Sequence, residues 1–307
     1  MKILLTGHRG YIGKVLKYRL EDVGHQVEGF EWSDGSFPDV MGYNHVIHLG
    51  AISSTTETDL ERIMTQNHDF SCRLLIACNQ AGVDLMYASS ASVYGLTEDN
   101  TPNPLNNYAW TKYLFDRLVE KNLNQKGSKI DIEVKGLRLF NVWGIPEAEM
   151  HKGSQASLMT QFHNQETVKL FKGSEKIYRD FIHVSDVCSI IISLLNVPKS
   201  GFYDVGTGTQ RSFLDVANVL VKSDQYAPTK IEWIDFPLTL IGKYQDNTKA
   251  YNAKLIKHIG GLKFRTLEEG DHPNDFIATY GKHISTSSDT KDPGLNEYHA
   301  AKKYADG

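Results

Sequence analysis

The chain has 307 residues, of which 40% are hydrophobic and 23% charged, a composition typical of a globular protein with one or two domains. The formal net charge of −4, with acidic and basic residues interspersed, gives no reason to expect nucleic acid or a membrane surface as a partner. The three cysteines form no C-x-x-C pattern, and the chain opens on a strand-like run. We therefore expect a cytoplasmic protein with buried free thiols and no metal site.

A glycine-rich turn follows the first predicted strand. The apolar run 3–6 leads into Gly7, Gly10 and Gly13, and a helical pattern continues through Leu20. Glycine lets the backbone approach a pyrophosphate closely, and a helix N-terminus supplies N–H donors for it. The order of strand, turn and helix predicts a dinucleotide-binding site.

The choice between NAD and NADP depends on two residues near this turn. The second predicted strand, 26–30, ends at Glu31, whose carboxylate can accept hydrogen bonds from a ribose 2′-OH and so favours NAD. Arg9 can bind a 2′-phosphate, which favours NADP, although a solvated loop charge is an equally good interpretation of it. We predict NADP held by Arg9, with NAD as the alternative.

Apolar segments then alternate with helical ones. The run 45–51 is typical of a buried parallel strand, and its closeness to Glu31 predicts a shortened crossover. A helix around 60–81 precedes another strand at 85–90. This alternation predicts an α/β fold with a doubly wound parallel sheet of the Rossmann type, which binds ligands at the carboxyl ends of its strands. Three polar residues fall just past such ends: Ser53, Ser90 and Asn141.

Tyr108 and Lys112 lie four residues apart in a predicted helix, so their side chains share one face. A nearby ammonium favours the phenolate, which makes a tyrosine usable as an acid or base near neutral pH. The spacing alone is weak evidence, because such pairs also occur on ordinary helix surfaces.

Six motifs place this pair in a wider pattern. They are Thr6-Gly7-x-x-Gly10-x-x-Gly13, Leu49-Gly50-Ala51, the run 87–95, Tyr108-x-x-x-Lys112, the run 138–144 and the run 179–186. In this order they resemble the extended short-chain dehydrogenase/reductase family.

The resemblance implies roles for individual residues. Ser90 would hydrogen-bond the reacting oxygen, Tyr108 would be the general acid/base, and Lys112 would hold the nicotinamide ribose and lower the pKa of the tyrosine. Gln66 stands where the family usually has an asparagine, although Asn67 follows it. The full set of implied cofactor contacts is Gly7, Arg9, Gly10, Tyr11, Ile12, Gly13, Glu31, Leu49, Ala51, Ser53, Gln66, Tyr108, Lys112 and Val142.

The substrate-facing stretches narrow the chemistry. Dehydratases of the family carry Asp-Glu after the active-site hydroxyl residue, whereas Ala91 and Ser92 follow Ser90 here, which leaves epimerases and reductases. Residues 1 to about 280 are most similar to the ADP-glyceromanno-heptose 6-epimerases. The stretches that carry this similarity are 53–57, 151–157, 169–175, 235–237 and 242–245.

Such an epimerase needs two acid/base groups, because hydride leaves one face of C6 and returns to the other through a 6-keto sugar. By resemblance Tyr108 serves one orientation and Lys152 the other, while a phosphate-binding loop lysine is the alternative for Lys152. Arg179 would clamp the diphosphate, unless it pairs with Asp180 or Asp186. The predicted substrate contacts are Ser53, Asn141, Ser154, Gln161 (or His163), Phe171, Ser174, Arg179 and Tyr244.

The predicted organisation has two domains. Residues 1–142, with 181–206 returning to them, form the dinucleotide-binding domain; 143–180 and 207–284 form the substrate-binding domain; 285–307 are a polar tail. The expected partners are ADP-heptose or another nucleotide sugar, and further copies of the chain in a homo-oligomer. A different nucleotide-sugar epimerase or reductase is the alternative function. A non-enzymatic dinucleotide sensor is disfavoured because Ser90, Tyr108 and Lys112 are all present.

Overall fold

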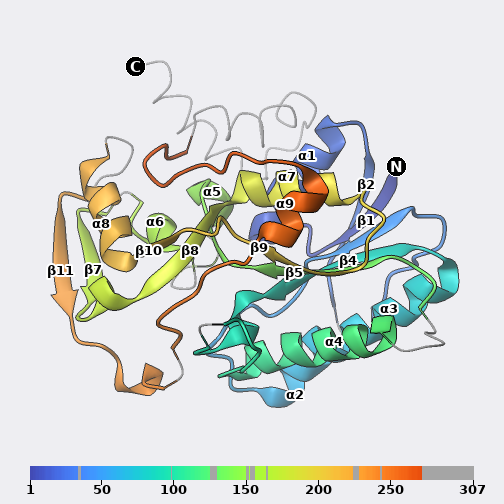
Figure 1. The fold of residues 1–307 in the computed structure, drawn as a ribbon, viewed down its shortest axis with the longest axis horizontal. Coiled ribbons are helices and arrows are strands. Elements are labelled where there is room, and N and C mark those ends of the chain that lie inside the picture. The colour runs from blue at the N-terminus through green and yellow to red at the C-terminus, as the bar shows by residue number, and fades with distance from the viewer. Residues whose placement is uncertain are drawn as a thin grey trace.

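A six-stranded parallel sheet forms the centre of the molecule (Figure 1), with the strand order β2-β1-β3-β4-β5-β9. The computed structural model describes residues 1–33, 36–97, 99–124, 130–149, 152, 156–163, 165–223, 228–242 and 244–271. Successive strand residues face opposite sides, so Ile3 and Leu5 enter one core cluster and Leu4 enters the other. The strands are β1 (Lys2–Thr6), β2 (Gln26–Phe30), β3 (His45–His48), β4 (Asp84–Ser90), β5 (Val134–Leu139) and β9 (Gly201–Val205).

Helices cover both faces of this sheet, which confirms the predicted doubly wound Rossmann-type fold. Helices α1, α7 and α9 lie on one face, and α2, α3 and α4 lie on the other (Figure 1). In the part of the chain that the structure describes, no helix is both long and apolar enough to cross a membrane. The bounds are α1 (Tyr11–Asp22), α2 (Leu60–Ile63), η1 (Met64–Asp69), α3 (Phe70–Ala81), η2 (Ala91–Tyr94), α4 (Asn107–Asn124), α7 (Val184–Leu194) and α9 (Ala253–Ile259).

The predicted elements differ from the observed ones in two places. The third predicted strand ends at His48 rather than at Ala51, because the chain turns there beneath the glycine turn. The predicted helix around 60–81 is interrupted by the π-helical turn η1. The shortened crossover is confirmed, since 31–33 and 36–44 hold no helix or strand.

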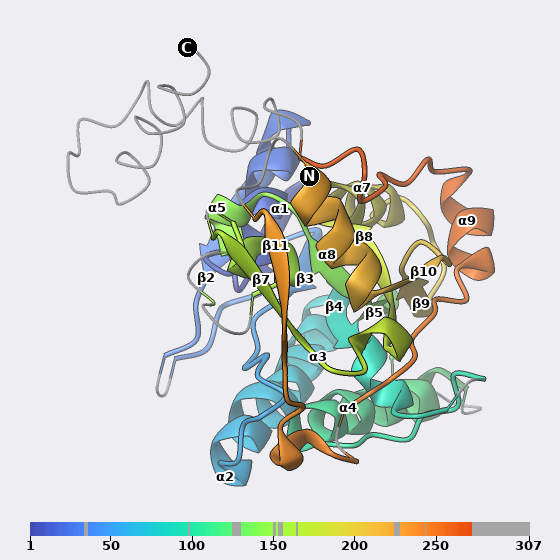
Figure 2. The same ribbon diagram turned by 90° about the vertical axis from the view of Figure 1, so that its left-hand side faces the viewer.

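A smaller lobe packs at the edge of the main sheet. Figure 2 shows its parallel pair β7 and β11 in front, with α8 against them. Its core cluster includes Trp143, Phe181 and Leu220. The predicted domain boundaries stay a prediction. The lobe and its connections comprise β6 (Asn141–Trp143), α5 (Pro146–Glu149), α6 (Leu158–Gln161), β7 (Thr167–Phe171), η4 (Ser174–Lys176), β8 (Tyr178–His183), β10 (Gln210–Ser212), α8 (Phe213–Lys222), β11 (Lys230–Ile234) and η5 (Leu238–Leu240).

A buried carboxylate fastens α4 to the sheet. Asp116 Oδ1 accepts a 2.9 Å hydrogen bond from the Tyr87 hydroxyl, and Oδ2 accepts one from Ser89 Oγ at 2.9 Å. The Arg138 Nε lies 3.0 Å from the same Oδ2. Because Asp116 is 1% exposed, its charge depends on this cation and these donors.

We expect Asp116→Ala to lower the free energy of unfolding by about 3–5 kcal/mol, because it leaves the Arg138 charge buried without its partner. Denaturant unfolding of the variant measures this. Adding Arg138→Met should restore part of the loss, whereas Glu120→Ala, on the exposed side of the same helix, should change little. A loss in Asp116→Ala no larger than in Glu120→Ala would contradict the anchoring role.

Candidate active site

The glycine turn between β1 and α1 is closely packed. Gly7 has a φ of +73°, and a Cβ there would lie 2.5 Å from the backbone nitrogen of Gly50. A Cβ at Gly13 would collide with the carbonyl oxygen of Gly7. No side chain caps α1 at Gly10, so the helix N-terminus keeps its donors for a ligand. These features fit the pyrophosphate of a dinucleotide.

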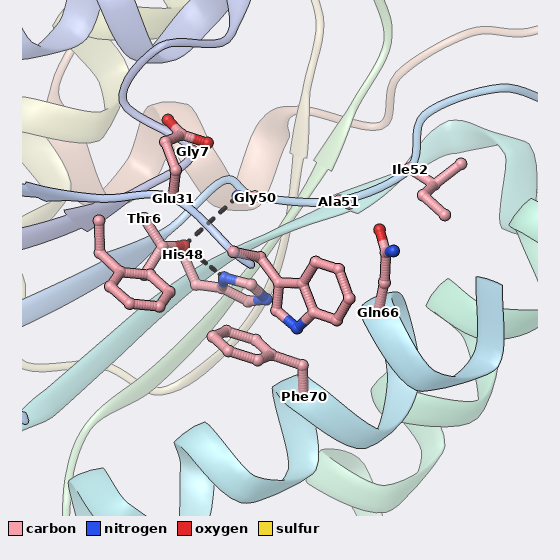
Figure 3. Close-up of a pocket in the computed structure, with 11 residues that line it drawn as sticks. Thr6, Gly7, Glu31, His48, Gly50, Ala51, Ile52, Gln66 and Phe70 are labelled. Atoms are coloured by element: carbon pink, nitrogen blue, oxygen red, sulfur yellow. Dashed lines mark hydrogen bonds between the residues drawn. The ribbon is translucent and has the colours of Figure 1, made fainter. Parts of the chain in front are cut away.

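A pocket of about 170 Å³ lies at the carboxyl ends of β1, β2 and β3 (Figure 3). Four residues predicted for the cofactor line it: Gly7, Glu31, Ala51 and Gln66. The remaining lining residues were not predicted from the sequence as cofactor contacts: Thr6, Phe30, Trp32, His48, Gly50, Ile52 and Phe70.

The floor of this pocket is polar but neutral. The imidazole of His48 lies 2.6 Å from Thr6 Oγ1 and 3.0 Å from Ser71 Oγ, with the ring of Phe70 beneath it (Figure 3). Burial lowers the pKa of His48 to about 3, and the Lys112 charge adds to this shift. The histidine is therefore neutral at physiological pH and adds no charge to the pocket.

Gln66 and Asn67 have different roles. The side chain of Gln66 points into the pocket toward Ala51 and Ile52 (Figure 3). The amide of Asn67 is buried and binds both backbone groups of Ile52, accepting from its N–H at 2.8 Å and donating to its carbonyl at 2.9 Å. Asn67 Nδ2 also lies 3.2 Å from Thr111 Oγ1 on α4. The π-helical turn thus presents Gln66 to the pocket and uses Asn67 to join the β3 loop to α4.

Glu31 is fixed at the edge of the pocket. Its Oε1 accepts a 2.6 Å hydrogen bond from the backbone nitrogen of Arg9 and lies 3.2 Å from His8 Nδ1. The side chain of Arg9 itself is exposed.

Ser90, Tyr108 and Lys112 meet at the end of β4. Ser90 Oγ accepts hydrogen bonds from the nitrogen of Ser92 at 3.1 Å and its hydroxyl at 2.9 Å, so it caps the next turn. The Ser90 side chain also interacts with the phenol of Tyr108 and acts to lower its pKa. The Lys112 ammonium donates to the Ala88 carbonyl at 2.8 Å and lies 5.9 Å from the centre of the Tyr108 ring.

The expected lowering of the Tyr108 pKa by Lys112 is not what the structure gives. Burial raises the pKa of Tyr108, the Ser90 hydrogen bond opposes this, and the Asp116 charge adds to the rise. Burial also lowers the pKa of Lys112 to about 8, although Asp116 pulls it upward. Desolvation of both groups outweighs the effect that spacing alone predicts.

Lys152 lies beside the glycine turn. Its Nζ is 3.5 Å from Glu149 Oε1 and 5.5 Å from the centre of the Tyr11 ring. The Tyr11 hydroxyl donates to the carbonyl of Gly144 at 2.6 Å. These contacts place Lys152 where the cofactor turn meets the smaller lobe.

Arg179 is held between aromatic rings in the smaller lobe. Its guanidinium lies 5.1 Å from the centre of the Tyr244 ring and 5.7 Å from that of Phe213, and it also donates to the Gln245 carbonyl. The alternative partners are engaged elsewhere, because Asp180 accepts from Thr207, Gly208 and Ala250, and Asp186 accepts from Arg265. Burial lowers the pKa of Arg179, and Tyr244 and Asp246 oppose this.

Two predicted substrate residues lie on one aromatic row. Phe236 stacks edge-on with Phe171 at 5.3 Å and with Tyr244 at 5.8 Å between ring centres. Phe213 was not predicted from the sequence, and Phe236 was named only as part of the stretch 235–237, since only the fold brings Phe213 to Arg179 and Phe236 to Tyr244.

The other residues predicted to contact cofactor or substrate are spread over several parts of the fold. Ser53 is exposed, Asn141 begins β6, Ser174 is 3% exposed, and Gln161 donates to the Ala156 carbonyl at 2.6 Å. The cofactor candidates Ile12, Leu49 and Val142 pack against the core cluster over α1 and α7. Ser154 and the tail 285–307 lie outside the described residues.

Comparisons with known proteins agree with this arrangement. The model of the NAD dependent epimerase/dehydratase family matches residues 3–206. An ADP-L-glycero-D-manno-heptose-6-epimerase of Brachyspira hyodysenteriae is 42% identical over 221 residues, which are 68% of this chain and 68% of that protein.

Solved structures show the same fold. The Helicobacter pylori ADP-L-glycero-D-manno-heptose-6-epimerase superposes with a TM-score of 0.72 at 25% identity, covering 93% of this chain and 96% of that chain. The Thermus thermophilus UDP-glucose 4-epimerase with NAD superposes with a TM-score of 0.71 at 21% identity, covering 94% and 100%.

The low pKa of Lys112 makes the stability of the protein depend on pH. Between about pH 8 and 10.5 the unfolded chain binds more protons at Lys112 than the folded one, so the cost of burying this residue disappears as the pH rises. Relative to Lys112→Met, the wild type should gain about 3 kcal/mol of unfolding free energy over this range. Urea unfolding at several pH values measures the difference. Lys121→Met, exposed on the same helix, is the control, and a gap between wild type and Lys112→Met that is constant with pH would refute the assignment.

Proposed function

Because the chain belongs to the NAD dependent epimerase/dehydratase family, we propose that it inverts C6 of an ADP-glycero-manno-heptose by transient oxidation and re-reduction with a tightly bound nicotinamide cofactor. The observation that carries the proposal is the meeting of Ser90, Tyr108 and Lys112 at the carboxyl end of β4, on the sheet edge where the glycine turn follows β1, in a chain 42% identical to a heptose epimerase.

The residues present fit a dinucleotide. The glycine turn and the open N-terminus of α1 suit its pyrophosphate, and the pocket suits one nucleoside end. When bound there, the nicotinamide would supply the hydride chemistry, accepting hydride from C6 and returning it to the opposite face.

Tyr108 would exchange the proton of the C6 hydroxyl. Ser90, whose side chain interacts with the phenol, would help to hold the sugar oxygen by a hydrogen bond. The ammonium of Lys112, 5.9 Å from the centre of the ring, would stabilise the phenolate. These three residues form one complete proton-transfer unit.

Lys152 would serve the second orientation of the sugar. After the ketone turns over, its oxygen faces away from Tyr108, and a second donor must protonate it as hydride returns. Lys152 lies near the cofactor turn, on the side of the smaller lobe. Contact with a cofactor phosphate is the competing role for this cation.

The diphosphate of the substrate would lie at Arg179. A buried guanidinium between two aromatic rings, bonded to carbonyl oxygens, keeps its positive charge for an anionic ligand. The aromatic row of Phe171, Phe236 and Tyr244 would provide apolar surface for the adenosine.

For the cofactor, the contacts of Glu31 support NAD. Its carboxylate lines the pocket, where it would accept from a ribose 2′-OH and repel a 2′-phosphate. The prediction that Arg9 holds NADP is untested. The domain boundaries, the homo-oligomer and the cytoplasmic location also stay predictions.

We expect purified protein to interconvert the two C6 epimers of ADP-glycero-manno-heptose, followed by NMR or chromatography. Tyr108→Phe and Lys152→Met should each slow epimerisation about 10²- to 10⁴-fold, since each removes an acid/base group. If the protein leaves the ADP-heptose unchanged but converts another nucleotide sugar, this proposal is wrong. The alternative, an epimerase or reductase acting on a different nucleotide sugar, then takes its place. A fully active Lys152→Met enzyme would remove only the two-base part.

Cofactor choice can be read from binding alone. Glu31→Gln should raise the affinity for NADP relative to NAD by roughly tenfold, because it removes a charge facing the 2′ position. Calorimetry with both cofactors gives the ratio. Arg9→Ala is the matched variant. If Arg9→Ala selectively loses affinity for NADP while Glu31→Gln leaves the ratio of the two affinities unchanged, the protein prefers NADP and the choice of NAD is wrong.

A further inference from the structure

Glu149, the last residue of α5, is a buried acid without a part in the chemistry described so far. It is 1% exposed. Its Oε1 accepts from the backbone nitrogen of Ser157 at 3.0 Å, and Oε2 accepts from Ser157 Oγ and Thr160 Oγ1, both at 2.7 Å. These three donors fix the orientation of the carboxylate.

A buried carboxylate also requires a positive charge nearby. Lys152 is the cation that the structure places beside it, with Nζ 3.5 Å from Oε1 and a side chain that is 25% exposed. The pair is therefore asymmetric, since the carboxylate is fixed inside the protein while the ammonium reaches toward the surface of the site.

The ammonium also lies near the start of α1. The ring of Tyr11 lies 5.5 Å from Nζ, and its hydroxyl is tied to Gly144 at the start of the segment that leads into α5. A lysine has a long flexible stem, so contacts with both a carboxylate and a ring restrict where its ammonium can lie.

We propose that Glu149 is a positioning residue that holds the Lys152 ammonium in place for the second proton transfer. The proposal rests on the function proposed above. Glu149 acts through Lys152 and is itself too enclosed by Ser157 and Thr160 to meet a substrate.

The two half-reactions separate this role from a purely structural one. In a two-base enzyme one epimer is oxidised with Tyr108 as the base and the other with Lys152. Glu149→Gln keeps the size of the side chain and removes its charge. Oxidation of the Lys152-dependent epimer should fall about a hundredfold, as expected for a displaced catalytic group, and oxidation of the other epimer should stay within about twofold. The absorbance of reduced nicotinamide after rapid mixing with each epimer measures both rates.

Three further variants make the test specific. Glu149→Asp keeps the charge and should recover part of the lost rate. Glu149→Gln combined with Lys152→Met should be no slower than Lys152→Met alone, because both changes disable one group. Glu166→Gln, an exposed glutamate of the same lobe, should behave as the wild type.

An equal loss for both epimers, or additive effects in the double variant, would overturn the proposal. If the wild type oxidises neither epimer, the proposed function fails. The contact between Glu149 and Lys152 can then still be tested by the rate at which Lys152 is chemically acetylated. Mass spectrometry should find Lys152 acetylated several-fold faster in Glu149→Gln than in the wild type, and equal rates would overturn the contact. Glu149→Asp serves for both measurements if the Gln variant does not fold.

Discussion

The ion pair between Asp116 and Arg138 is the interaction on which the position of α4, the helix of the candidate active site, depends. The carboxylate takes donors from β4 and β5 at once, so α4 cannot slide along the sheet without breaking a buried network. Arg138 extends the network to the hydroxyl of Tyr94 at 2.9 Å, which in turn is bound to Asp204 on β9. These contacts hold α4, the helix that carries the candidate acid/base, in a fixed position against the strands β4, β5 and β9.

This anchoring has an electrostatic consequence for the candidate catalytic pair, Tyr108 and Lys112. Asp116 lies one turn beyond Lys112 and two beyond Tyr108, so both groups sense its charge. The same burial that fixes the helix removes water from the phenol and the ammonium. Desolvation therefore sets the direction of both pKa shifts, and the interaction with Ser90 opposes the rise at Tyr108.

Local sequence was sufficient wherever a single element determines the feature. The glycine turn, the strands at 3–6, 26–30 and 85–90, and the shared face of Tyr108 and Lys112 all follow from short-range spacing. The interruption at η1 does not, because it depends on Asn67 reaching the backbone of Ile52, a tertiary contact.

Features built from distant segments were out of reach of sequence patterns. Trp32, His48 and Phe70 come from three separate elements and share a pocket only after the sheet forms. Phe213 and Phe236 meet the surroundings of Arg179 in the same way. In the sequence, Glu149 cannot be told from the other acidic residues of its segment, and only its burial in the fold sets it apart from them.

The two candidate proton-transfer lysines depend on carboxylates in different ways. Asp116 divides its charge between Lys112 and Arg138, and the Lys112 ammonium bonds to a neutral carbonyl, so burial dominates and its pKa falls to about 8. Lys152 lies directly against Glu149, whose remaining donors are hydroxyls and an amide without net charge. Lys112 therefore carries a positive charge that is only weakly neutralised by its neighbours, and such a charge can stabilise a phenolate at Tyr108. Lys152 is held as one half of a close ion pair, an arrangement suited to presenting a proton from a fixed position.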